Sequence, residues 1–85
     1  MKYKIIIMKP AQKFILKQAK PQQERILKAI NQLPDQGDIK PLSGHDGIYR
    51  LRIGDVRVIY TIENDILVVR VLFAGSRGDV YKSPF

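Results

Sequence analysis

Apolar and polar residues alternate along the stretch 48–71, which predicts antiparallel strands with one buried face. The first strand runs Ile-Tyr-Arg-Leu-Arg-Ile from position 48, and the alternation resumes after Gly54-Asp55 as Val-Arg-Val-Ile-Tyr. Gly54-Asp55 suits a two-residue hairpin turn with glycine at the first central position. This turn fixes a register. The predicted pairs are Ile53 with Val56, Arg52 with Arg57, Leu51 with Val58, Arg50 with Ile59 and Tyr49 with Tyr60.

A second turn is predicted at Asn64-Asp65, because both residues tolerate a positive φ. A two-residue loop there adds a third strand and completes a three-stranded meander. It places Ile59 opposite Arg70 and Arg57 opposite Leu72.

Successive side chains point to opposite faces of a sheet, so this register divides the meander into a core face and an arginine face. The predicted core face holds Tyr49, Leu51, Ile53, Val56, Val58, Tyr60, Ile62, Leu67, Val69, Val71 and Phe73. The other face holds Arg50, Arg52, Arg57 and Arg70. Like charges directly opposed across two strands destabilise a sheet by roughly 0.2–1 kcal/mol. The pair Arg52–Arg57 therefore predicts that an anion is held on this face.

The N-terminal half predicts a strand and two helices. Residues 3–8 are rich in isoleucine and form a strand that we expect to join the same sheet. Pro10 suits the first turn of a helix that continues to about Lys20, with Ala11, Phe14, Ile15 and Ala19 as its apolar stripe. Pro21 begins a second helix, which ends at Pro34 and carries its stripe at Ile26, Leu27, Ile30 and Leu33. The two helices form an αα-hairpin that covers the core face.

The remaining segments predict loops and one short extended piece. Residues 34–47 contain Pro, Asp, Gly and Ser in loop-like density, with Leu42 as the expected inward anchor. After Gly75 and Gly78, Val80-Tyr81 resumes an extended pattern and could add a short C-terminal strand. The fold class is therefore α+β, in one domain spanning residues 1–85: strand, αα-hairpin and antiparallel three-stranded meander.

The charge of the chain favours a polyanionic or acidic partner. The net charge is +7 and the pI about 9.9. Five of the six arginines lie between positions 50 and 77, whereas eight of the nine lysines lie at or before Lys40. Arginine presents a planar fork suited to phosphate, and lysine a hydrated point charge. The arginines are therefore interpreted as a binding site, and the alternative is that they only solubilise the open face of the sheet.

Several classes of chemistry are not supported by the residues present. The chain has no cysteine and a single histidine, His45, so no metal-ligand set or cofactor is expected. Ser43 and Ser76 lack a positioned base. The short apolar run at 5–8 fits neither a signal peptide nor a membrane span, and it predicts a soluble cytoplasmic protein with no membrane partner. Lys13, Lys17 and Lys20 share a helical face that is either simply solvated or contacts phosphate.

The chain closely resembles RelE-type toxins of the RelE/ParE superfamily over nearly its whole length, and most specifically in its C-terminal half. The resemblance rests on Leu42-Ser43-Gly44, on the run 49–60 and on the run Gly75-Ser-Arg-Gly-Asp-Val-Tyr81. It implies the toxin of a type II toxin–antitoxin system. Such a toxin is a ribosome-dependent endoribonuclease that cleaves mRNA in the decoding site and is held inactive by an acidic RelB-like antitoxin in a hetero-oligomer.

The resemblance also implies site residues. Arg57 and Arg77 match the active-site arginines of the family, Tyr81 matches its C-terminal tyrosine, and Arg50 and Arg52 stand where the family has basic residues, often lysine. Arg70, Lys82, Lys13 and Lys17 are further candidate RNA contacts that are not part of the matched site. Two other functions stay open: a ParE-like toxin that poisons DNA gyrase, and a non-catalytic nucleic-acid-binding module. The second would need exposed aromatic residues for base stacking.

Overall fold

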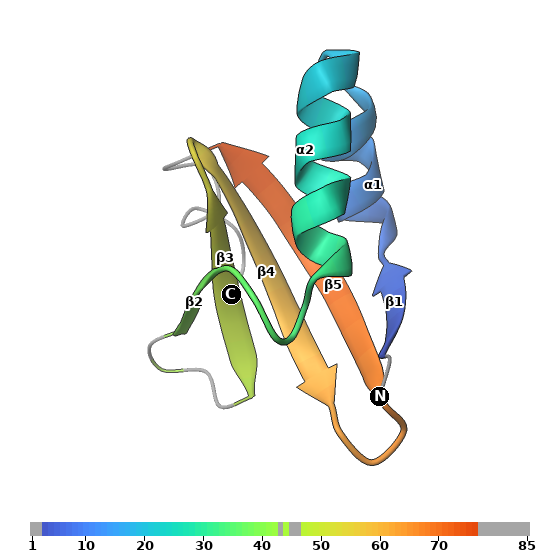
Figure 1. Cartoon of the computed structure of the whole chain (residues 1–85), viewed down its shortest axis with the longest axis vertical. Coiled ribbons are helices and arrows are strands. Elements are labelled where there is room, and N and C mark those ends of the chain that lie inside the picture. The colour runs from blue at the N-terminus through green and yellow to red at the C-terminus, as the bar shows by residue number, and fades with distance from the viewer. Residues whose placement is uncertain (1–2, 43, 45–46, 77–85) are drawn as a thin grey trace.

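The computed structural model describes residues 3–42, 44 and 47–76, which form two helices packed on a mixed five-stranded sheet (Figure 1). The elements in chain order are β1 Lys4–Ile7, α1 Lys9–Leu16, α2 Lys20–Asn31, β2 Asp38–Pro41, β3 Ile48–Ile53, β4 Val56–Glu63 and β5 Val68–Ser76. The strand order is β1-β5-β4-β3-β2. Neither helix in these ranges is long and apolar enough to cross a membrane.

The first hairpin has the predicted register. Gly54 takes a φ of +58°, which glycine adopts at little cost, and β3 and β4 meet around it. Arg52 lies directly opposite Arg57, and Tyr49 lies opposite Tyr60, so all five predicted pairs are confirmed.

The second turn is longer than predicted. Glu63 pairs with Val68, so the loop comprises residues 64–67 and not Asn64-Asp65 alone. Leu67 takes the left-handed conformation with a φ of +54°. The positive φ was expected at asparagine or aspartate, because a leucine rarely adopts it.

A β-bulge changes the register further along the same strand pair. The ladder shifts between Ile59 and Tyr60, so Leu72 is an extra residue on β5. The observed pairs Ile59–Phe73 and Arg57–Gly75 replace the predicted Ile59–Arg70 and Arg57–Leu72, which are wrong. Because one extra residue reverses which side chains point inward, Ala74 takes the core position that was predicted for Phe73.

The predicted loop 34–47 contains a strand. Asp38–Pro41 (β2) pairs antiparallel with β3 and forms an edge of the sheet. A four-residue edge strand with Asp, Lys and Pro has too little apolar alternation to be recognised, and Pro is tolerated there because an edge strand needs fewer hydrogen bonds. Ile39 of this strand packs against the core, and Leu42, the predicted anchor, is half-buried just after it.

The helices cover one face of the sheet only (Figure 1). Their buried residues Ala11, Ile15, Ile26 and Ile30 pack in one cluster with the inward residues of β3, β4 and β5. The first helix ends at Leu16, earlier than predicted, and Ala19 and Leu27 are exposed. Pro10 and Pro21 lie in the first turns of α1 and α2, as predicted.

The N-terminal strand joins the sheet as predicted. It runs parallel to β5, with Ile5 opposite Val69 and Ile7 opposite Val71. The αα-hairpin connects β1 to the meander on one side of the sheet, and neither of the two described helices lies on the opposite face of β3 and β4 (Figure 1). The alternate residues of those strands, the arginines among them, lie on that face.

Candidate functional site

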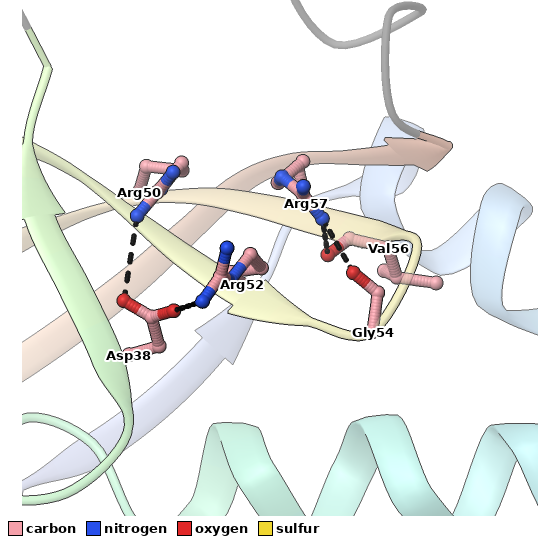
Figure 2. Close-up of polar contacts among 6 residues, drawn as sticks. All are labelled: Asp38, Arg50, Arg52, Gly54, Val56 and Arg57. Carbon is pink, nitrogen blue, oxygen red and sulfur yellow. Dashed lines mark hydrogen bonds and ion pairs between the residues drawn. The ribbon is translucent and has the colours of Figure 1, made fainter.

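Three arginines and one aspartate meet on the face of the sheet that the helices leave uncovered. Arg50 and Arg52 extend from β3, Arg57 from β4 and Asp38 from β2 (Figure 2). These four residues are called the arginine cluster below. The inward neighbours of the arginines, such as Leu51 and Val58, belong to the core, so a well-packed sheet fixes the backbone beneath the cluster.

Arg57 is held at the hairpin turn by main-chain acceptors. Arg57 is only 7% exposed. Its Nη1 donates a hydrogen bond to the carbonyl oxygen of Gly54 at 2.6 Å and another to that of Val56 at 3.2 Å (Figure 2). Both bonds use one terminal nitrogen of the guanidinium fork. The side chain is therefore preorganised, and its charge is not neutralised by a carboxylate within the described residues.

Arg50 is a largely buried cation with few partners. Its side chain is 14% exposed, and its Nη2 lies 3.5 Å from Oδ1 of Asp38. Among the described residues, neither its Nε nor its Nη2 has a hydrogen-bond partner, although both atoms are buried. An unsatisfied buried donor costs roughly 1–3 kcal/mol, and more when it is charged. This arrangement favours a bound acceptor, such as a phosphate oxygen, at Arg50.

Asp38 supplies a carboxylate that the sequence did not reveal. It lies opposite Arg52 on β2, with its Oδ2 2.5 Å from Arg52 Nη2. Arg52 thus has Arg57 on one side and Asp38 on the other. The predicted anion beside the like-charge pair is in part this carboxylate. It was missed because its strand was predicted as a loop.

Arg70 does not join the cluster. Its Nε and Nη2 each lie 3.1 Å from Oε2 of Glu63, in a separate ion pair on the same face of the sheet. Arg70 lies opposite Thr61, which is four residues along β4 from Arg57. At about 3.3 Å per residue, that separation is about 13 Å. The predicted grouping of Arg70 with the other arginines depended on the register that proved wrong.

The tyrosines of the hairpin point into the core, as predicted. Tyr49 and Tyr60 stack with ring centroids 5.7 Å apart and an interplanar angle of 27°. Burial raises the pKa of Tyr60 to about 12, with a further contribution from Tyr49. Neither ring lies on the arginine face, so they do not form a stacking platform for bases there.

The other candidate residues lie elsewhere or outside the described residues. Lys13 and Lys17 are exposed on α1 and just after it, in the helical layer on the opposite side of the sheet from the arginine cluster. Arg77, Tyr81 and Lys82, with the predicted C-terminal strand at Val80-Tyr81, lie outside the described residues, as do Ser43 and His45. Within the described part of the chain, no group of three or more His, Asp or Glu could hold a metal ion.

Comparison with known families identifies the class of protein. The model of the ParE toxin family of type II toxin–antitoxin systems matches residues 5–81. A protein of Methanocaldococcus jannaschii, named as the candidate toxin RelE1, is 38% identical over 55 residues, which is 64% of this chain and 61% of that protein. The match thus spans about three fifths of the length of that relative.

Solved structures of RelE toxins share the fold. The RelE–RelB complex of Pyrococcus horikoshii matches with a TM-score of 0.76 at 28% identity, over 92% of this chain and 98% of the other. A RelE mutant of E. coli in the free state matches with a TM-score of 0.75 at 21% identity, over 96% and 93% of the two chains. The chain belongs to the ParE toxin family of type II toxin–antitoxin systems, and its fold is that of RelE toxins.

Proposed function

We propose that this protein is a toxin that cleaves mRNA on the ribosome and is restrained by an acidic antitoxin. The observation that carries the proposal is the arginine cluster: three guanidinium groups on the sheet face away from the helices, one of which has buried N–H groups without an acceptor among the described residues. Arginine forks bind phosphate through charge-assisted hydrogen bonds. The resemblance of this stretch to RelE-type toxins supports RNA as the source of the phosphate.

The proposed reaction is attack of the RNA 2′-hydroxyl on the adjacent phosphorus. The new bond joins the 2′-oxygen to phosphorus, the bond to the 5′-oxygen breaks, and a 2′,3′-cyclic phosphate remains. Arg57 and Arg77 would bind the non-bridging oxygens and stabilise the charge that develops on them. Arg50 and Arg52 would position the backbone. Tyr81 would orient the 2′-hydroxyl or, as a tyrosinate favoured by the neighbouring guanidinium groups, accept its proton, since arginine stays protonated and cannot act as a base. The departing 5′-oxygen would take up a proton from water.

The proposed partners are an acidic antitoxin and mRNA on the ribosome. Solved relatives from Pyrococcus horikoshii and E. coli are RelE–RelB or RelBE toxin–antitoxin complexes. The +7 charge of this chain fits an acidic partner of that kind. The ribosome would supply substrate alignment, which the three-arginine site cannot provide by itself.

The test is cleavage of mRNA on purified ribosomes, with identification of the ends. Wild type should leave 2′,3′-cyclic or 3′-phosphate ends, and Arg77→Ala and Tyr81→Phe should lower cleavage by roughly 100-fold or more. Finding 3′-hydroxyl ends, or full activity in both folded variants, would refute the mechanism.

Arg57 needs a milder substitution than alanine. Its bonds to two carbonyls stabilise the turn, so alanine would remove a structural contact together with the charge. Arg57→Lys keeps one cation, but a single ammonium cannot provide the planar fork that reaches both the turn and a phosphate. It should lose most cleavage while its melting temperature stays within a few degrees of wild type.

The match to the ParE family supports a second candidate function, inhibition of DNA gyrase without RNA cleavage. A supercoiling assay with purified gyrase separates the two. Inhibition of supercoiling by a protein that leaves ribosome-bound mRNA intact would establish the second function. Cleavage of mRNA with unaffected supercoiling would establish the first.

A further inference from the structure

Asp38 brings a carboxylate into the arginine cluster and divides it between two arginines (Figure 2). One oxygen, Oδ2, lies 2.5 Å from Arg52 Nη2, and the other, Oδ1, lies 3.5 Å from Arg50 Nη2. No second carboxylate of the described ranges forms an ion pair with these arginines. A phosphate would bind in the same way, with one oxygen at each of the two guanidinium groups.

The position of Asp38 is set by the strand that carries it. β2 is hydrogen-bonded to β3, and its residue 38 lies directly opposite Arg52. The carboxylate therefore approaches Arg52 from one side, while Arg57 approaches from the other. Without Asp38, the cluster would hold three like charges on adjacent strands, and the side chain of Arg52, which is 53% exposed, would have no fixed direction.

We propose that Asp38 is a positioning residue that aligns Arg50 and Arg52 for the reacting phosphate and weakens the binding of RNA before reaction. This inference rests on the proposed RNA cleavage. Asp38 engages the same N–H groups that a phosphate would engage, so RNA must displace at least one of its contacts. Weak binding of the substrate combined with aligned charges is productive, because only interactions that strengthen in the transition state raise kcat.

Asp38→Asn separates the two effects. The amide has nearly the shape of the carboxylate but lacks its charge. The positive charges of Arg50 and Arg52 are then no longer offset by a carboxylate and attract RNA more strongly, but the two arginines lose the group that fixes them. RNA binding should therefore become tighter, and turnover should become slower. A purely structural role would instead lower the amount of folded protein and leave the KM of the folded fraction unchanged.

The binding experiment uses a short, fully 2′-O-methylated oligoribonucleotide, which has no 2′-hydroxyl to react. We expect Asp38→Asn to lower its Kd roughly threefold to tenfold at 150 mM salt, where the screening length is about 8 Å. A freed arginine contacting one more phosphate steepens the plot of log K against log salt by about 0.7 for a single strand. Asp38→Glu keeps the charge and should retain the wild-type slope.

Glu63→Gln is a matched control. The side chain of Glu63 is 36% exposed against 37% for Asp38, it also pairs with an arginine, and its substitution changes the net charge by the same amount. It lies away from the cluster, beside Arg70. Its Kd should change by less than about twofold, because exposed charges at that distance are largely screened. Equal shifts in the two variants, or weaker binding by Asp38→Asn, would overturn the proposal.

The kinetic experiment measures kcat and KM for mRNA cleavage on ribosomes. Asp38→Asn should lower both, kcat by roughly tenfold or more, since a displaced guanidinium no longer meets the developing charge. An unchanged kcat would overturn the positioning role. If wild type cleaves no RNA, the proposed function fails, and the binding comparison still decides whether Asp38 controls anion affinity.

An NMR titration of the wild-type protein tests the same proposal without depending on the folding of a variant. The carboxylate carbon of Asp38 can be followed by NMR while the methylated oligonucleotide is added. Displacement of Asp38 from the arginines should shift this resonance, and that of Glu63 should stay in place. An unshifted Asp38 resonance at saturating RNA would show that the carboxylate does not compete with phosphate, contrary to the proposal.

Discussion

The hydroxyl of Tyr60 is buried without a hydrogen-bond partner among the residues described, and it makes the stability of the fold sensitive to high pH. Its pKa is raised from 10.0 to about 12, first by burial and then by Tyr49. The unfolded chain therefore releases this proton before the folded chain does, and folding stability falls as the pH rises from about 10 to 12. At 1.36 kcal/mol per pKa unit, the loss reaches about 2 to 3 kcal/mol.

We predict that Tyr60→Phe removes this alkaline loss. The substitution deletes an unpartnered polar group and keeps the ring, so at pH 8 the variant should be as stable as wild type or slightly more stable. Between pH 10 and 12 it should become the more stable protein by a growing margin. Urea unfolding of both proteins at pH 8 and 11 measures this, and the comparison cancels the lysines that titrate in the same range. Parallel pH curves would contradict a raised pKa at Tyr60.

The individual residues also show what the sequence could and could not predict. The opposition of Arg52 and Arg57 was predictable because a two-residue turn leaves only one register for the strands that flank it. Asp38 was not, because its contacts depend on a partner strand with no apolar alternation of its own. The three arginines of the cluster were therefore visible in the sequence, and the carboxylate that pairs with two of them was not.

Among the elements, β2 depends on Gly37, the residue that immediately precedes it. Gly37 has a φ of +126°, a region that residues with a Cβ rarely adopt. A Cβ built there would lie 2.6 Å from Cδ1 of Leu51, and Leu51 is fully buried and cannot move aside easily. The path into β2, and with it the place of Asp38, therefore needs glycine at position 37.

We predict that Gly37→Ala destabilises the fold by about 2 to 4 kcal/mol, through backbone strain and overpacking against Leu51. Gly54→Ala is the comparison. Gly54 has a φ of +58°, a conformation that other residues adopt at moderate cost, and its added Cβ would meet the exposed side chain of Arg25 at 3.3 Å. It should cost about 1 kcal/mol, so thermal melts should rank Gly37→Ala below Gly54→Ala. The reverse order would show that β2 does not depend on this contact.

The order of the elements was easier to predict than the register of β4 against β5. Strand, helix, helix and meander follow from periodicity and from the prolines at 10 and 21, which lie where predicted. The bulge between Ile59 and Tyr60 has no sequence signal, since every residue around it is apolar or β-branched. One extra residue on β5 then moved Ala74 into the core. The longer loop at 64–67 placed Arg70 opposite Thr61 instead of Ile59, and so two residues farther from Arg57 along β4.

At the scale of the whole molecule, the positive charge is divided between the two faces of the sheet. The arginine cluster lies on the uncovered face, and exposed lysines such as Lys13 and Lys17 lie in the helical layer on the other. A short RNA bound at the cluster cannot contact both layers, whereas an acidic protein approaching from any direction is attracted by the total charge of +7. Loss of lysines on the helical layer should therefore affect the two partners differently.

We predict that the double substitution Lys13→Gln and Lys17→Gln slows association with the acidic antitoxin and leaves RNA binding unchanged. Association should be slower by roughly twofold to fivefold at low salt, because long-range attraction accelerates encounter, and dissociation should change little. The difference should vanish near 0.5 M salt as the charges are screened. Stopped-flow mixing with the antitoxin measures the rates, and titration with the methylated oligonucleotide measures RNA binding. Weaker binding of that oligonucleotide would instead restore Lys13 and Lys17 as RNA contacts, and it would require the RNA path to extend around the sheet to α1.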